Sequence, residues 1–203
     1  MFPDVNGTGK SRFLRALALL VVAAPLAACA GKPSNDTYSL SSVPSVEGPA
    51  ATSKQILVPE PTALKALDSD QIVIRLSGSE LQYLAKSQWG DRLPRMVQSK
   101  LVQAFENSGK VGGVGKPGEG LAIDYQVVTE IRSFEVDTTG SRTAVVEIFA
   151  KIVNDRNGTV RAQKAFRATV PVSGTGAPAY IKGLDGAGAR VVADIVRWTL
   201  TAI

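Results

Sequence analysis

Apolar and polar residues alternate along three long segments in the second half of the chain. Residues 121–136, 142–154 and 159–172 each place most of their apolar side chains on one face, as strands of a half-buried sheet do. Turn-forming residues separate them at 138–141 and 155–158, and the second turn contains Asn-Gly, a strong signal for a tight hairpin. The pattern therefore predicts three consecutive antiparallel strands.

Shorter strands are predicted in the first half. Residues 38–43 begin with the same alternation, 44–53 is a loop rich in proline, and 55–58 is a short apolar strand that Pro59 ends. Residues 71–76 and 80–87 flank a Ser-Gly-Ser turn, so we expect a hairpin over 71–87. A competing interpretation starts a helix after residue 79, with Ser79 as its N-cap.

Two segments have the helical spacing of three and four residues. The first covers 91–108 and ends before Gly109, and the second covers 179–202. The apolar stripe of the second helix comprises Leu184, Ala187, Val191, Ile195 and Trp198. These elements together predict a single α+β domain, an antiparallel sheet with two helices packed on one face.

The start of the chain has the features of a secretory signal. Lys10, Arg12 and Arg15 precede an apolar run over 16–26, which is shorter than the roughly 20 residues of a spanning helix. The run closes with Leu-Ala-Ala before Cys29, and this junction resembles the lipobox of bacterial lipoproteins. An ordinary secretory signal that happens to be followed by a cysteine is the alternative.

The lipobox resemblance implies that Cys29 carries acyl chains such as palmitate and that the chain is cleaved before it. Residues 1–28 would then be the signal peptide, 29–37 a lipidated cysteine with a flexible tether, and 38–203 the folded domain. Two or more acyl chains hold a protein on a bilayer stably. Ala30 replaces the Asp that favours retention in the inner membrane, so we expect the periplasmic side of the outer membrane, with the inner membrane as the alternative.

Composition narrows the chemistry. The 203 residues include no histidine and one cysteine, so an intrachain disulfide and the usual zinc clusters are excluded. The net charge of +5 is scattered along the chain and forms no basic stripe, so no nucleic-acid partner is expected. We therefore expect no metal, no cofactor and no enzymatic activity.

The motifs that could contradict this expectation are weak. Residues 113–118 match G-x-G-x-x-G, but a helix precedes them, a strand follows them and Pro117 disfavours the required helix. We expect residues 109–120 to be a flexible glycine-rich loop. Paired carboxylates could support glycosidic chemistry, but a solvated sheet face is the favoured explanation of these residues. The acidic residues on or beside the strands are Asp124, Glu130, Glu135, Asp137 and Glu147.

Two tryptophans have two interpretations. Trp89 lies just before the first helix and Trp198 near the end of the second. Both fit packing in the core or at its edge. Because tryptophan is enriched at interface hot spots, both are also candidate contacts to a partner protein.

The order of motifs is similar to that of the ABC-type transport auxiliary lipoprotein component family. The matching residues are Tyr38-x-Leu40, Ile56-Leu57-Val58-Pro59, Tyr83, Trp89-Gly90-Asp91-x-Leu93-Pro94, Leu101-x-x-Ala104-Phe105, Asp124-Tyr125-x-Val127, the strand 144–152 and Ala193-Asp194-Ile195-Val196-x-Trp198.

This resemblance implies a periplasmic-facing, non-catalytic accessory of an MCE-type ABC lipid transport system. Its partners would be an MCE-domain protein and, through it, an ABC permease and ATPase, with phospholipid as a further candidate ligand. The sequence alone leaves two alternatives open: an envelope lipoprotein that binds a lipid or glycan itself, and a structural adaptor for cell-wall machinery.

Overall fold

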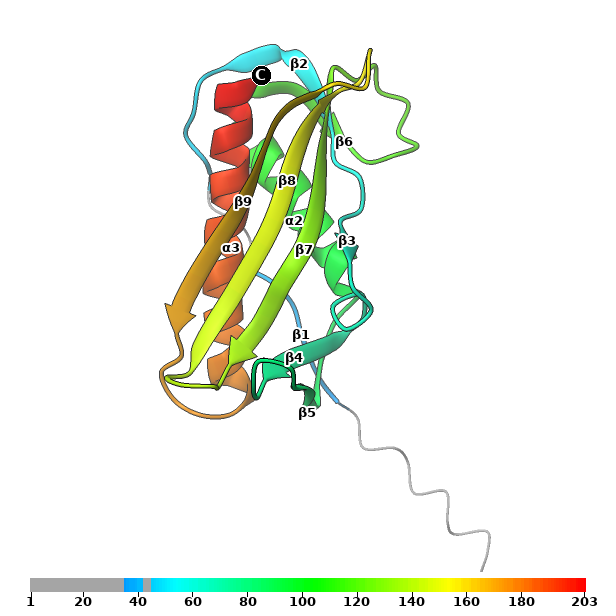
Figure 1. The fold of residues 1–203 in the computed structure, drawn as a ribbon. Coiled ribbons are helices and arrows are strands. Elements are labelled where there is room, and N and C mark those ends of the chain that lie inside the picture. The colour runs from blue at the N-terminus through cyan, green and yellow to red at the C-terminus, as the bar shows by residue number, and fades with distance from the viewer. Residues whose placement is uncertain (1–34, 42–44) are drawn as a thin grey trace, which may run out of the picture. The chain divides into compact units, whose positions relative to one another are not determined.

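A computed structural model describes residues 35–41 and 45–203, and three long strands form one side of its sheet, with the last of them at the edge (Figure 1). They are β7 (Tyr125–Asp137), β8 (Thr143–Asn154) and β9 (Val160–Pro171). Adjacent strands in this group are antiparallel, and Ile148 of β8 is paired with Ile131 on one side and Phe166 on the other. The predicted meander of three antiparallel strands is therefore confirmed.

The sheet is mixed, which corrects the prediction of a purely antiparallel one. The second edge of β7 is shared by β2 (Ala51–Leu57), β3 (Thr62–Ala63) and β4 (Gln71–Arg75), and all three run parallel to β7. They follow β7 in order, from its first residues to its last. The chain between 51 and 75 thus accompanies β7 as one interrupted strand, and Pro59 and Pro61 lie in its first interruption.

The predicted hairpin is also present. Strand β5 (Leu81–Trp89) pairs antiparallel with β4, so the strand interpretation holds over the helix capped by Ser79. Strand β1 (Asp36–Tyr38) adds to β5 in parallel, with Asp36 beside Ser87. The sheet therefore begins two residues before the expected start of the domain at residue 38, and the expected strand over 38–43 is reduced to its first residue among those described.

The glycine-rich segment after the first helix is a strand rather than a flexible loop. Strand β6 (Val111–Gly115) runs parallel to β2. A Cβ on Gly112 would lie 2.4 Å from the backbone oxygen of Thr52, closer than any side chain permits. Glycine is needed here because the two backbones approach so closely. The G-x-G-x-x-G match at residues 113–118 does not form a dinucleotide-binding turn, because its first three residues belong to β6 and no helix starts inside it.

Two helices cover one face of the sheet, as predicted (Figure 1). Helix α2 (Leu93–Ser108) has Pro94 in its first turn and ends at Gly109, whose φ of 59° is left-handed. Helix α3 (Ala177–Ala202) packs against the inner face of β7, β8 and β9. The largest fully buried side chains are Trp89, Phe105, Phe134, Ile56, Ile72, Leu93, Leu101, Ile131, Ile148, Ile152, Leu184 and Ile195.

Candidate functional site

The proposed lipidation site lies outside the described residues, but the point where the domain begins is defined. The Asn35 amide donates to the Gln88 side chain at 3.0 Å, and β1 follows directly. Within residues 35–41 and 45–203, no helix combines the length and the apolar character needed to cross a bilayer. Because β1 pairs with β5, the described part of the chain begins at the edge of β5 that faces away from β4.

Trp89 is a core residue. Only 1% of its surface is exposed, and its ring meets Phe134 edge-on with centroids 5.8 Å apart. An aromatic pair of this geometry stabilises a core beyond its buried area. Trp89 has no surface to offer a partner in this conformation, so the packing interpretation replaces the contact interpretation here.

Trp198 differs because it lines the molecular surface. It is half-buried and meets Phe166 of β9 with centroids 5.3 Å apart and an angle of 63° between the rings. The two rings border a hollow of about 410 Å³ between β9 and α3. Lys164, Phe166, Asp194, Arg197, Trp198 and Thr201 line this hollow, which we call the aromatic hollow.

The aromatic hollow lies beside a free strand edge. Among the described residues β9 pairs with β8 alone. The Val172 N–H donates to the Arg142 oxygen at 3.0 Å, and this bond sets the phase of the ladder. Because backbone groups in an antiparallel pair alternate in direction, the backbones of 163, 165, 167 and 169 point away from β8. This outer row can accept an added strand.

Cations dominate this edge. Strand β9 contains Arg161, Lys164 and Arg167 and no acidic residue. Lys164 Nζ lies 5.2 Å from the centroid of Phe166, within cation–π distance. Arg197 is paired with Asp194 at 2.7 Å, and Arg167 with Glu147 at 2.8 Å. No ion pair neutralises Lys164 among the described residues, so the edge favours an acidic segment.

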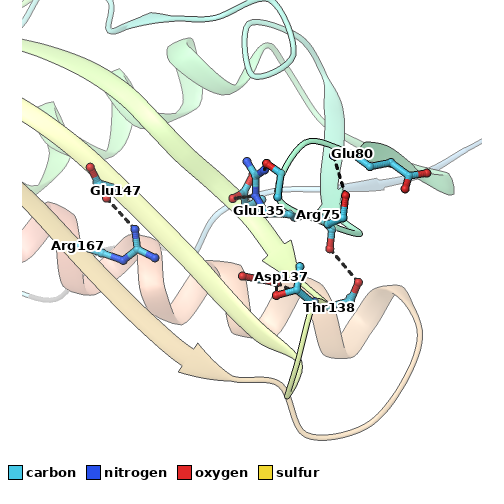
Figure 2. Close-up of polar contacts among 10 residues, drawn as sticks. Arg75, Glu80, Glu135, Asp137, Thr138, Glu147 and Arg167 are labelled. Atoms are coloured by element: carbon cyan, nitrogen blue, oxygen red, sulfur yellow. Dashed lines mark hydrogen bonds and ion pairs between the residues drawn. The ribbon is translucent and has the colours of Figure 1, made fainter.

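The acidic residues of the sheet form separate ion pairs rather than a catalytic pair. Glu135 binds Arg75 and Glu147 binds Arg167, as Figure 2 shows. Asp124 and Glu130 likewise pair with Arg156 at 3.2 Å and Arg132 at 3.3 Å.

Asp137 is held in its ionised form. Hydrogen bonds from the Thr139 backbone and hydroxyl lower the pKa of Asp137 below its ordinary value. A glycosidase pair needs one carboxyl whose pKa is raised so that it stays protonated. Asp137 is therefore unsuited to act as that acid.

The described residues form neither a metal site nor a pocket for an acyl chain. They contain no cluster of three potential metal-ligating side chains. The pocket near Leu40, Phe134 and Gly188 holds about 10 Å³, roughly the space of one water and too little for an acyl chain. This pocket gives no support to a lipid-binding role of the domain itself.

A family comparison identifies the class of protein. The sequence model of the ABC-type transport auxiliary lipoprotein component family matches residues 38–196, which is most of the described domain. The chain belongs to this family. Its members are described as lipoproteins that assist ABC-type transport, a role that agrees with the expected lack of catalysis.

Individual relatives agree with the fold. The crystal structure of protein XCC0632 from Xanthomonas campestris has a TM-score of 0.76 and 27% identity, covering 82% of this chain and 95% of that one. A further uncharacterized protein of known structure has a TM-score of 0.65 at 16% identity, covering 82% of this chain and 99% of that one.

One curated relative is longer than this chain. Uncharacterized protein bll6063 of Bradyrhizobium diazoefficiens is 30% identical over 169 residues, which is 82% of this chain. The chain spans about half of that relative, since the match covers 45% of it.

Sequence patterns alone missed the aromatic hollow. Phe166 lies on a predicted strand and Trp198 on a predicted helix, but they are separated by 31 residues and nothing local pairs them. The sequence contains one indication of this site. Residues 160–171 include no acidic residue, so all charges on this strand are positive.

Proposed function

We propose that this protein is a lipid-anchored periplasmic accessory of an MCE-type ABC lipid transport system. Membership of the auxiliary lipoprotein family supports the transport role, and the lipobox at Cys29 supports the anchor. The protein acts through protein contacts and performs no chemistry itself. Ala30 after the cysteine favours the outer membrane as its location.

The aromatic hollow and the free edge of β9 are the docking surface in this proposal. An extended segment of the MCE-domain protein adds to β9, so that its backbone bonds to the outer row at 163, 165, 167 and 169. In such strand addition the main chain supplies affinity and pockets for alternate side chains supply specificity. One apolar side chain of the segment enters the aromatic hollow, and an acidic neighbour meets Lys164. The permease and ATPase are reached through that protein.

Crosslinked membranes provide the test. After purification of the lipoprotein, an MCE-domain protein should be recovered from wild type and from the Lys182→Glu control, which reverses an exposed charge elsewhere on α3. Recovery should fall several-fold for Lys164→Glu, because interfacial charge reversal opposes an acidic partner. Ala165→Pro should have a similar effect, because it removes a backbone donor that faces outward.

Trp198→Ala probes the aromatic hollow directly. Interface hot spots cost about 2 kcal/mol or more on truncation, so recovery should fall by about 30-fold. The thermal unfolding midpoint of each variant must stay near that of wild type for the comparison to count. Recovery of cell-wall synthases alone, or equal recovery of an MCE-domain protein from all variants, would contradict the proposal.

A further inference from the structure

Three loops meet at one end of the domain (Figure 1). They are the β4–β5 turn (76–80), the β7–β8 turn (138–142) and the β9–α3 loop (172–176). Hydrogen bonds join them: Thr138 donates from its N–H and its hydroxyl to the Arg75 oxygen at 3.0 and 2.8 Å, and Arg142 donates to the Gly174 oxygen at 3.0 Å. We call this surface the loop end.

The loop end combines few charges with exposed apolar side chains. Its three loops contain only Glu80 and Arg142 as charged residues. Leu76, Leu81 and Tyr83, at or beside the β4–β5 turn, are 38%, 42% and 47% exposed, and they are half of the six large apolar side chains exposed in the described residues. Tyrosine is enriched where a protein meets a membrane surface, since its ring is apolar and its hydroxyl is polar.

The entry point of the chain lies on the same side. Asp36 is in register with Ser87, and β1 runs parallel to β5, so Asn35, the first described residue, lies at the end of β1 that faces the start of β5 at Leu81. Ser87 follows Tyr83 by four residues, a span of at most about 14 Å. Asn35 is six positions after Cys29, so the two Cα atoms can be at most about 22 Å apart.

The opposite end of the sheet is much farther from the entry point. Strand β9 contains 12 residues and is therefore about 40 Å long, and its first residue, Val160, lies at the far end from the loop end. A tether of this length brings the loop end to the bilayer more easily than the β8–β9 turn. That far turn carries Asp155 and Arg156, whose charges favour water.

We propose that the loop end rests on the bilayer that holds the lipid anchor. Leu76 and Leu81 enter the headgroup region, and Tyr83 lies at its level. This contact rests on the proposed lipidation of Cys29. It would orient the sheet upright on the membrane, with the free edge of β9 exposed to the periplasm for a partner.

Spin labels can measure this contact in the lipidated protein. Cys29 is the only native cysteine, and its sulfur is blocked by the lipid, so one introduced cysteine gives one label. Gly78→Cys places it in the β4–β5 turn, where a Cβ meets nothing within 4 Å. Val160→Cys is the matched control at the far end, where the side chain is 51% exposed. Both proteins are reconstituted in vesicles of phosphatidylethanolamine and phosphatidylglycerol.

The expected result is a several-fold higher ratio of oxygen to nickel-chelate accessibility at position 78 than at position 160. The double change Leu81→Ser and Tyr83→Ser should lower the ratio at 78 toward the control value, with an unchanged unfolding midpoint.

Two outcomes would overturn the contact while leaving the anchor intact. The first is equal aqueous accessibility at both positions in a protein whose Cys29 is shown by mass spectrometry to carry acyl chains. The second is dipolar broadening between labels at position 78 that remain accessible to water. This result would assign the loop end to contact with a second copy of the chain. An unmodified Cys29 would refute the anchor and this contact together.

Discussion

The ion pair between Arg75 and Glu135 joins two parallel strands on the face of the sheet away from the helices. Arg75 Nε lies 2.6 Å from one carboxylate oxygen of Glu135, and its Nη2 lies 3.0 Å from the other. Glu135 is only 5% exposed, so its charge depends on this partner. The hydrogen bond to Glu135 in turn raises the pKa of the Arg75 guanidinium.

We expect Arg75→Leu to lower the free energy of unfolding by about 3–5 kcal/mol, because it leaves a buried carboxylate without its counter-ion. Urea unfolding at neutral pH, followed by circular dichroism, measures the change. The double variant Arg75→Leu with Glu135→Leu should recover most of the loss, because two apolar side chains replace a buried pair at little cost. If the single variant unfolds within about 1 kcal/mol of wild type, Glu135 is solvated in solution.

At the scale of elements, local patterns were enough for the long strands and for both helices. Alternation over 121–172 predicted β7, β8 and β9, and the helical stripes predicted α2 and α3. Strand direction could not be predicted, because alternation looks the same in parallel and antiparallel pairs. β2, β3 and β4 are parallel to β7 through contacts between residues about 65 positions apart, such as Val73 with Glu135.

The close approach of the β6 and β2 backbones could not be predicted from the sequence either. Residues 109–120 look flexible because glycine dominates them, yet β6 uses this absence of side chains to fit against β2. The two tryptophans show the same limit for the site. Only the tertiary contacts of Trp89 with Phe134 and Trp198 with Phe166 separate a core residue from a surface one.

The glycines of α3 allow a prediction about the helix–sheet interface. A Cβ on Gly183 would lie 3.0 Å from both Ala144 and Val172, whereas a Cβ on Gly186 meets nothing within 4 Å. Gly186→Ala should therefore stabilise the protein by about 0.5–1 kcal/mol, the helix propensity gain of alanine. Gly183→Ala should gain less or lose stability, because α3 must move away from β8. Unfolding curves of both variants give the comparison, and equal stabilisation would show that the interface is loose.

At the scale of the whole molecule, the N-terminal residues of the domain are part of its core. Leu40 is 8% exposed within the main apolar cluster, and Tyr38 packs against that cluster. Ser41 donates from its N–H and hydroxyl to the two carboxylate oxygens of Asp185 in α3, at 2.7 and 2.6 Å. Any pull from a lipid anchor would thus be transmitted to the sheet through β1 and to α3 through Ser41.

This arrangement predicts where the chain can be shortened. A fragment of residues 35–203 retains β1, Leu40 and Ser41, so we expect it to unfold in one cooperative step with the same urea midpoint as a chain of residues 29–203. A fragment of residues 45–203 exposes the cluster at Leu40, and burial of one leucine contributes about 1.5–3 kcal/mol. Its midpoint should fall accordingly. Equal midpoints for the two fragments would mean that residues 35–41 cover the core without stabilising it, and a pull at Cys29 would then detach them before the sheet opens.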